Sequence, residues 1–178
     1  MCKRIAFVAF LTVALVVLTV SARQDNSKRP SPAAHADCNL PNGTTIHVDY
    51  SSPRMNGRKI YPGLVPYGKV WRAGANEATT FVINKDVTVG GKDVPAGNYT
   101  IFVVPNADKW TLIVNKKTGE WGIPYKWESD ELLRTDMKVS AIDGPVENFT
   151  IGFDHAGGNC TLYMDWEQRR ASVEISGK

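Results

Sequence analysis

A short segment of the chain, residues 71–77, brings together side chains that can recognise a ligand. It reads WRAGANE, so an indole, a guanidinium, an amide and a carboxylate follow one another closely. An aromatic face supplies apolar contact area for a sugar or another polar small molecule, and a few polar groups set its orientation. The same residue types occur in rigid loops whose Asn and Glu side chains bind their own backbone amides. The segment therefore predicts either a binding site or a fixed loop.

The surrounding block, residues 51–80, is rich in bases, prolines and glycines. Between residues 51 and 78 it has five bases and one acid, whereas residues 127–167 have nine acids against two bases. Arginine offers a planar fork for a carboxylate, phosphate or uronate. Alternatively, the block's bases pair with the acidic segment and pin a loop to the sheet. The prolines and glycines predict one fixed backbone shape. The candidate ligand-binding residues are Arg54, Arg58, Trp71, Arg72, Asn76 and Glu77.

A metal-dependent enzyme is a weaker interpretation. His47 and Asp49 alternate onto one face of a predicted strand. With His155 they have the residue types of a two-histidine, one-carboxylate iron site. His47 lies too near the start of the exported chain for the usual arrangement, so no metal site and no cofactor are predicted.

A hydrolase is also chemically allowed, with Glu77 and either Asp154 or Asp165 as a carboxylate pair. The sequence contains no Gly-x-Ser-x-Gly elbow, phosphate-binding loop or zinc spacing of the His-Glu-x-x-His kind. The absence of these motifs favours a protein that is not an enzyme, but it leaves open whether the protein catalyses a reaction.

The N-terminus predicts export. Lys3 and Arg4 precede an apolar run that ends in Val20-Ser21-Ala22, the pattern of a signal peptide over residues 1–22. A periplasmic or extracellular protein with no membrane span in its mature form is expected. Removing the signal lowers the formal net charge from +3 to +1, because the segment holds two bases and no acid. A near-neutral chain without a basic helix or an aromatic-plus-glycine RNA signature is not expected to bind nucleic acid.

Two cysteines remain after export, Cys38 and Cys160. An even pair in an oxidising compartment predicts a disulfide. The alternative is two separate buried thiols. Neither has a Cys-x-x-Cys partner, so zinc or redox chemistry is not indicated.

The remaining pattern predicts strands. Residues 23–37 are polar and are expected to form a flexible leader, so the single domain is placed at residues 38–178. Apolar residues then alternate with polar ones in many short runs separated by glycine and proline turns, including Asp143-Gly144-Pro145. Residues 120–130, with three large aromatic residues, are expected to form a loop that covers one edge. The pattern indicates an all-β antiparallel sandwich, similar to a jelly roll.

Several long strings resemble the domain-of-unknown-function 2911 family. They include SSPRMNGRKIY, LVPYGKVWRAGANEATTF, TVGGKDVPAGNYTIFVVP and PVENFTIGFD, and the resemblance extends from Cys38 to Ile175. It implies a compact, exported, bacterial β-rich domain and brings no activity or catalytic residue. The residues that match the family's characteristic strings are Pro53, Arg54, Gly57, Arg58, Trp71, Arg72, Gly74, Asn76 and Glu77.

These observations predict a non-catalytic domain that binds a polar or anionic small molecule or an envelope glycan through residues 51–80. The alternative is a structural or interaction protein in which this block is scaffold. A hydrolase or metal-dependent jelly-roll enzyme is the second alternative. The sequence does not fix the oligomeric state.

Overall fold

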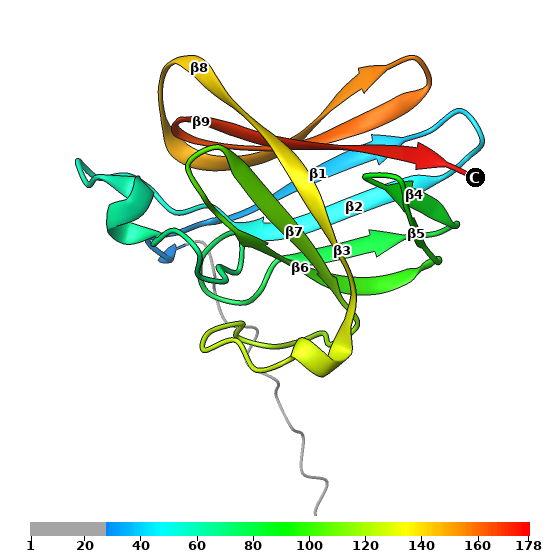
Figure 1. Cartoon of the computed structure of the whole chain (residues 1–178), viewed down its shortest axis with the longest axis horizontal. Helices are drawn as coiled ribbons and strands as arrows, with labels where there is room; N and C mark the ends of the chain where they lie inside the picture. The colour runs from blue at the N-terminus through cyan, green and yellow to red at the C-terminus, as the bar shows by residue number, and fades with distance from the viewer. Residues whose placement is uncertain (1–27) are drawn as a thin grey trace, which may run out of the picture.

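Nearly all regular structure in the protein is antiparallel β-sheet. The computed structural model describes residues 28–178, so the predicted signal peptide and the first part of the predicted leader lie outside the described residues. Within these described residues, nine strands form one sheet in the order β1-β2-β3-β6-β7-β8-β9-β4-β5 (Figure 1). The elements are β1 (Ala33–Asn39), β2 (Thr45–Ser51), η2 (Ile60–Leu64), β3 (Thr80–Ile83), β4 (Val87–Val89), β5 (Lys92–Val94), β6 (Gly97–Val104), β7 (Lys109–Asn115), η3 (Glu128–Asp130), β8 (Glu131–Ala156) and β9 (Asn159–Gly177). None of the helices in residues 28–178 is long and apolar enough to cross a membrane.

The sheet folds over so that β1 and β2 face β8 and β9 across the core (Figure 1). The Tyr50 hydroxyl on β2 lies 3.1 Å from the Ile151 amide nitrogen on β8, and this contact between the layers is buried. Strand β2 turns Ile46, Val48 and Tyr50 inward and places the residues between them outward. Such alternation is typical of a sheet with one apolar face. The predicted all-β antiparallel class is confirmed.

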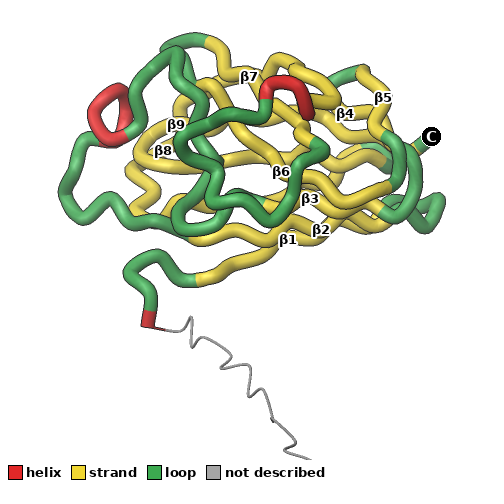
Figure 2. The backbone as a smooth tube through the Cα atoms, turned by 90° about the horizontal axis from the view of Figure 1, so that it is seen from below, coloured by secondary structure: helices red, strands yellow, loops and turns green. Residues whose placement is uncertain are grey.

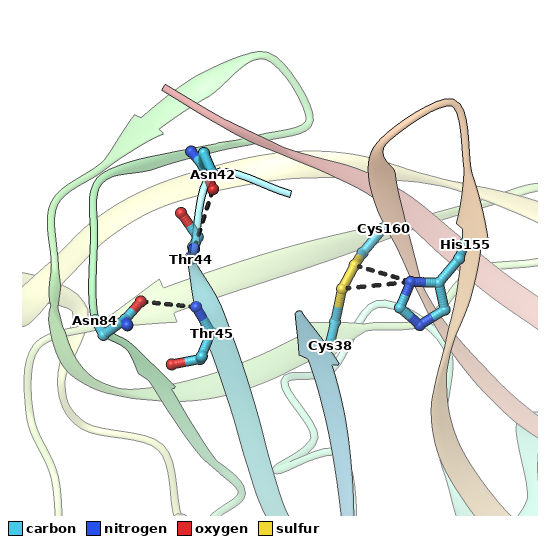
Figure 3. Close-up of a disulfide and its surroundings, with 7 residues drawn as sticks. All are labelled: Cys38, Asn42, Thr44, Thr45, Asn84, His155 and Cys160. Carbon is cyan, nitrogen blue, oxygen red and sulfur yellow. Dashed lines mark hydrogen bonds between the residues drawn. A yellow bond between two sulfur atoms is a disulfide. The ribbon is translucent and has the colours of Figure 1, made fainter. Parts of the chain in front are cut away.

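A disulfide joins β1 to β9. Cys38 and Cys160 are both buried, and their Cα atoms lie 6.5 Å apart, as a bridge requires. The His155 Nδ1 atom lies 3.9 Å from the Cys38 sulfur and 3.8 Å from the Cys160 sulfur (Figure 3). The predicted cysteine pair is confirmed.

Two sequence-based boundaries differ from the structure. Residues 33–37, expected in the leader, belong to β1, which pairs along its whole length with β2. The turn expected at residues 143–145 is instead a bulged part of β8, because the register with β9 shifts between Ala141 and Val146. A bulge accommodates glycine and proline within a strand without ending it.

The aromatic loop before β8 covers a face of the sheet, not the edge that the sequence predicted. Tyr125 and Trp127 pack against Phe102 on β6, and Ile113 on β7 belongs to the same cluster. Figure 2 shows the loop crossing the outside of these strands. The sheet is therefore apolar on both faces at β6 and β7, which explains why β6 reads as a continuous apolar run.

Candidate functional site

The arginine-rich block, residues 51–80, is tied to both layers of the sheet. At its start the Phe149 amide of β8 donates to the Pro53 carbonyl at 2.9 Å. Further on, Trp71 and Val103 of β6 exchange two backbone hydrogen bonds of 2.8 and 2.9 Å. The block is therefore fixed at two points that lie on different strands, and its side chains have defined positions.

A tight corner at residues 73–76 fixes the middle of the block. Ala73 and Asn76 both have left-handed backbone angles, with φ of 52° and 58°. Such a conformation costs a residue other than glycine about 1–2 kcal/mol. Three side-chain hydrogen bonds hold it: Thr79 Oγ1 donates to the Ala73 carbonyl, and Asn76 Nδ2 donates to the Ser31 carbonyl and to Ser51 Oγ. Asn76 thus has the loop-fixing role that the sequence left open.

A cavity of about 350 Å³ opens beside this corner, and we refer to it as the Arg72 cavity. Its volume is within the range of small-molecule sites, roughly 300–1,000 Å³. It has two arginines and no acid among its lining residues. Two of its aliphatic residues are exposed, Leu64 at 43% and Ile123 at 44%. The residues that define it are Arg58, Leu64, Trp71, Arg72, Ile123 and Trp166.

The Arg72 guanidinium has few partners for a partly buried charge. Nη1 donates to the Trp121 carbonyl at 3.0 Å, and the guanidinium carbon lies 5.2 Å from the centroid of the same indole ring. Nε is buried and has no hydrogen-bond partner within residues 28–178. Burial lowers the pKa of Arg72, while the charge of Glu77 opposes this shift. The cation is therefore desolvated without a carboxylate in contact.

Two other arginines, Arg134 and Arg170, have the carboxylate partners that Arg72 does not have within the described residues. Arg134 donates through Nε and Nη2 to both carboxylate oxygens of Glu131, each at 2.7 Å. Arg170 uses the same two nitrogens to hold Asp165 at 2.8 and 2.7 Å. These carboxylates raise the pKa of each arginine. In Arg72, by contrast, Nε has no acceptor among the described residues, and Nη1 donates to a backbone carbonyl instead of a carboxylate.

The far wall of the cavity comes from a loop that sequence analysis did not connect to the block. The Ala78 amide donates to the Glu120 carbonyl at 3.0 Å, which brings the following residues against Arg72. Gly122 has a φ of 90°, and a Cβ atom there would lie 2.9 Å from the Cβ of Ala78 and 3.1 Å from that of Arg72. Only glycine permits this approach. Gly122, a glycine within the aromatic loop, was the sequence feature that could have indicated this close approach.

The other two predicted arginines mainly hold the loop together. Arg54 Nη1 donates to the Ser52 carbonyl at 3.0 Å and to its hydroxyl at 2.7 Å. Arg58 donates through Nε to the Met55 carbonyl and through Nη2 to the Arg54 carbonyl, while its side chain also lines the cavity. Arg58 therefore joins Arg72 at the site, and Arg54 does not.

Trp71 is not the open aromatic platform that the sequence predicted. It is buried, stacks on Trp166 at a centroid distance of 5.7 Å and meets Phe149 edge-on at 4.9 Å. Its ring belongs to the core, because burying this large apolar surface stabilises the fold. Only part of it lines the cavity. The exposed indole is that of Trp121, which is 55% exposed.

Glu77 lies in a different place from the Arg72 cavity. Arg29 Nη1 donates to both of its carboxylate oxygens, at 2.9 and 2.7 Å, and lowers the pKa of Glu77. The two residues line a separate hollow of about 160 Å³, smaller than a usual ligand site. Glu77 is thus neutralised within the protein.

The proposed pairing between the block's bases and the acidic segment does not occur. No base of the block takes part in a salt bridge formed within residues 28–178. The acidic segment instead holds the backbone of the block. Glu147 accepts from the Asn56 amide at 2.8 Å, and Glu167 accepts from the Ile60 amide at 3.2 Å. The bases of the block are therefore not neutralised by carboxylates within residues 28–178.

The structure does not bring together the residues of the predicted iron site. His47 contacts Asp37 at 2.5 Å and Asp49 at 3.1 Å, which raises the pKa of His47. His155 lies instead against the disulfide, so the three residues of the iron hypothesis are not brought together.

The carboxylates of the hydrolase hypothesis are engaged elsewhere. Asp154 and Asp165 both bind Arg170, whereas Glu77 binds Arg29. Each candidate acid already has a cation partner.

A second cavity, of about 750 Å³, is lined in part by Tyr61 and Pro62 of η2. Its charges balance, since Lys59 and Arg169 are matched by Asp108 and Glu167. The buried Tyr61 hydroxyl has no hydrogen-bond partner within the described chain, and burial raises the pKa of Tyr61. A lining with balanced charges does not favour an anion over a neutral molecule. The second cavity therefore fits the predicted binding of an anion by arginines less well than the Arg72 cavity does.

The Glu131 ion pair predicts a specific pH dependence of stability. Arg134 lowers the pKa of Glu131, and the Tyr125 hydroxyl, which donates to it at 2.7 Å, acts in the same direction. Because the pKa of Glu131 is lower in the folded protein than in the unfolded chain, the ionised carboxylate stabilises the folded state at neutral pH. This contribution is lost as the pH falls from the unfolded-chain pKa of 4.5 through the lower pKa of the folded protein. We expect urea unfolding at pH 7 and pH 3 to show that acidification lowers the free energy of unfolding of the Glu131→Gln protein by about 1 kcal/mol less than that of the natural protein. Equal losses would contradict the assignment.

Comparison with known proteins gives a family and no activity. Searches among curated proteins and solved structures returned no match. A family described as "Protein of unknown function (DUF2911)" matches residues 31–175, which include β1 and the whole arginine-rich block. The chain therefore belongs to the DUF2911 family.

Proposed function

We propose that the protein binds an anionic small molecule, or the acidic sugar of an envelope glycan, in the Arg72 cavity. The observation that carries this proposal is the partly desolvated Arg72 guanidinium, which contacts no carboxylate of residues 28–178 and lines a cavity free of acids. A partly buried guanidinium whose Nε has no acceptor within the described residues adds little to the stability of the fold, which favours a role in binding.

The lining indicates the kind of ligand. Arg72 and Arg58 suit a carboxylate or phosphate group, because both guanidinium groups can donate to anionic oxygens. Leu64 and Ile123 offer apolar area for a ring attached to that anion. Uronic acids and aromatic carboxylates combine these two features. The same lining has neither a carboxylate nor an imidazole, which supports binding over acid–base catalysis.

Matched probes test the charge requirement. We expect calorimetry to show that glucuronate binds more tightly than glucose, and benzoate more tightly than benzyl alcohol. Arg72→Leu should weaken binding of either anion about 10- to 100-fold, because a hydrogen bond to a charged group contributes roughly 1.5–3 kcal/mol. The same substitution should change the free energy of unfolding by less than about 1 kcal/mol, because it removes the unpartnered Nε and its one hydrogen bond within residues 28–178, from Nη1 to the Trp121 carbonyl, is exposed.

Arg134→Leu is the matched control. It removes a guanidinium that is satisfied inside the protein, so it should lower stability and leave anion binding unchanged. Two results would overturn the proposal: equal affinity for the charged and neutral probes, or an Arg72→Leu protein that loses several kcal/mol of stability with unchanged binding. The second result would favour the scaffold alternative.

A further inference from the structure

Two of the three histidines of the chain come together on the outside of the sheet, although the sequence separates them by twelve residues. His35 and Asp37 lie on β1, and His47 and Asp49 lie on β2. The strands pair so that His35 is opposite Asp49 and Asp37 is opposite His47. Alternation turns all four side chains away from the core, so they form one polar patch on the hairpin.

Both ring nitrogens of His47 contact carboxylates of the patch. Asp37 binds Nδ1 of His47 at 2.5 Å, which fixes the ring and directs Nε2 to the other side. Carboxylates hold metal-binding histidines in this way. Nε2 lies 3.1 Å from Oδ2 of Asp49. Two ligand atoms that share a tetrahedral zinc ion at about 2.0–2.1 Å are themselves about 3.3 Å apart, so this pair is already spaced for one ion.

The second imidazole completes the ligand set. The His35 ring lies roughly parallel to that of His47, with centroids 6.0 Å apart and planes 29° apart. His35 is exposed and stands directly opposite Asp49, and binding the same ion requires a change of its side-chain rotamer. His155, the remaining histidine, contacts the disulfide and takes no part.

We propose that His35, His47 and Asp49 bind a divalent zinc ion on the outer face of β1 and β2, with Asp37 orienting His47. The set offers two nitrogen ligands and one oxygen ligand, which suits zinc better than calcium or magnesium because the latter prefer oxygen alone. Three protein ligands leave a fourth position open. The sequence alone did not predict this site, because it placed His35 in a leader and paired His47 with His155.

Zinc titration of the purified, disulfide-bonded protein carrying no histidine tag tests the proposal. We expect one equivalent of Zn²⁺ to bind by calorimetry and Ca²⁺ to give no binding heat. His35→Ala and His47→Ala should each weaken zinc binding at least tenfold, and Asp37→Asn should weaken it by about 10- to 100-fold through loss of the supporting contact. These side chains lie on the surface, so thermal unfolding should show that each variant keeps its fold.

His155→Ala is the matched control and should bind zinc like the natural protein. The proposal is overturned if no zinc binds, or if the His35→Ala and His47→Ala proteins bind it unchanged. Loss of binding in His155→Ala alone would also overturn it, because that result would place the ion at the cysteine pair.

Discussion

Trp166→Ala should lower the free energy of unfolding by about 3–5 kcal/mol, the range for removing a large buried aromatic ring. Trp166 stacks on Trp71, meets Phe149 at a centroid distance of 5.7 Å and approaches Tyr61 at 6.4 Å. Its Nε1 donates to the Glu147 carbonyl at 3.2 Å. The ring thus joins two residues of the arginine-rich block to β8 and β9, so its loss affects both the core and the support of the Arg72 cavity.

Urea unfolding followed by circular dichroism measures this effect. Trp121→Ala is the matched control, because that indole is 55% exposed and should cost less than about 1 kcal/mol. If Trp166→Ala cost no more than Trp121→Ala, the packing between the block and the sheet would not contribute as described here.

Removing the disulfide should have an effect of similar size. Cys38 and Cys160 are 122 residues apart, and both are buried between β1 and β9. Closing so long a loop stabilises by about 4–5 kcal/mol through the entropy of the unfolded chain, less any strain in the folded state. The Cys38→Ala/Cys160→Ala protein should therefore unfold at a much lower urea concentration than the natural protein.

A reductant separates the disulfide's contribution from that of side-chain packing. The reduced natural protein should approach the stability of the double variant, while the variant itself should not respond to reductant. A natural protein whose unfolding is unchanged after complete reduction, verified by thiol alkylation and mass spectrometry, would contradict this assignment.

The fold was more predictable from sequence than the site, and β1 and β2 show why. Strand β2 alternates large apolar residues with polar ones, so its inward face is evident from local pattern. Strand β1 reads AAHADCN, where the inward residues before the cysteine are only alanines, and it was therefore assigned to the leader. Its strand conformation depends on pairing with β2, which local pattern does not reveal.

The site was predictable only in part. Arg72 and Arg58 stand out by composition, and both line the cavity. Ile123 and Trp121 come from a distant loop whose position depends on the close approach at Gly122. Trp71 was misjudged because the sequence does not show that Trp166 and Phe149 cover its ring.

Arg72 contacts no carboxylate of residues 28–178, and we propose that this guanidinium binds an anion. The most direct measurement follows the Nε–H signal of Arg72 by ¹H–¹⁵N NMR during titration with glucuronate, with glucose as the neutral control. The signal is assigned by its loss in Arg72→Lys. We predict that it shifts progressively and saturates with glucuronate and stays in place with glucose. A signal that does not move with glucuronate, or that moves equally with both sugars, would contradict the claim.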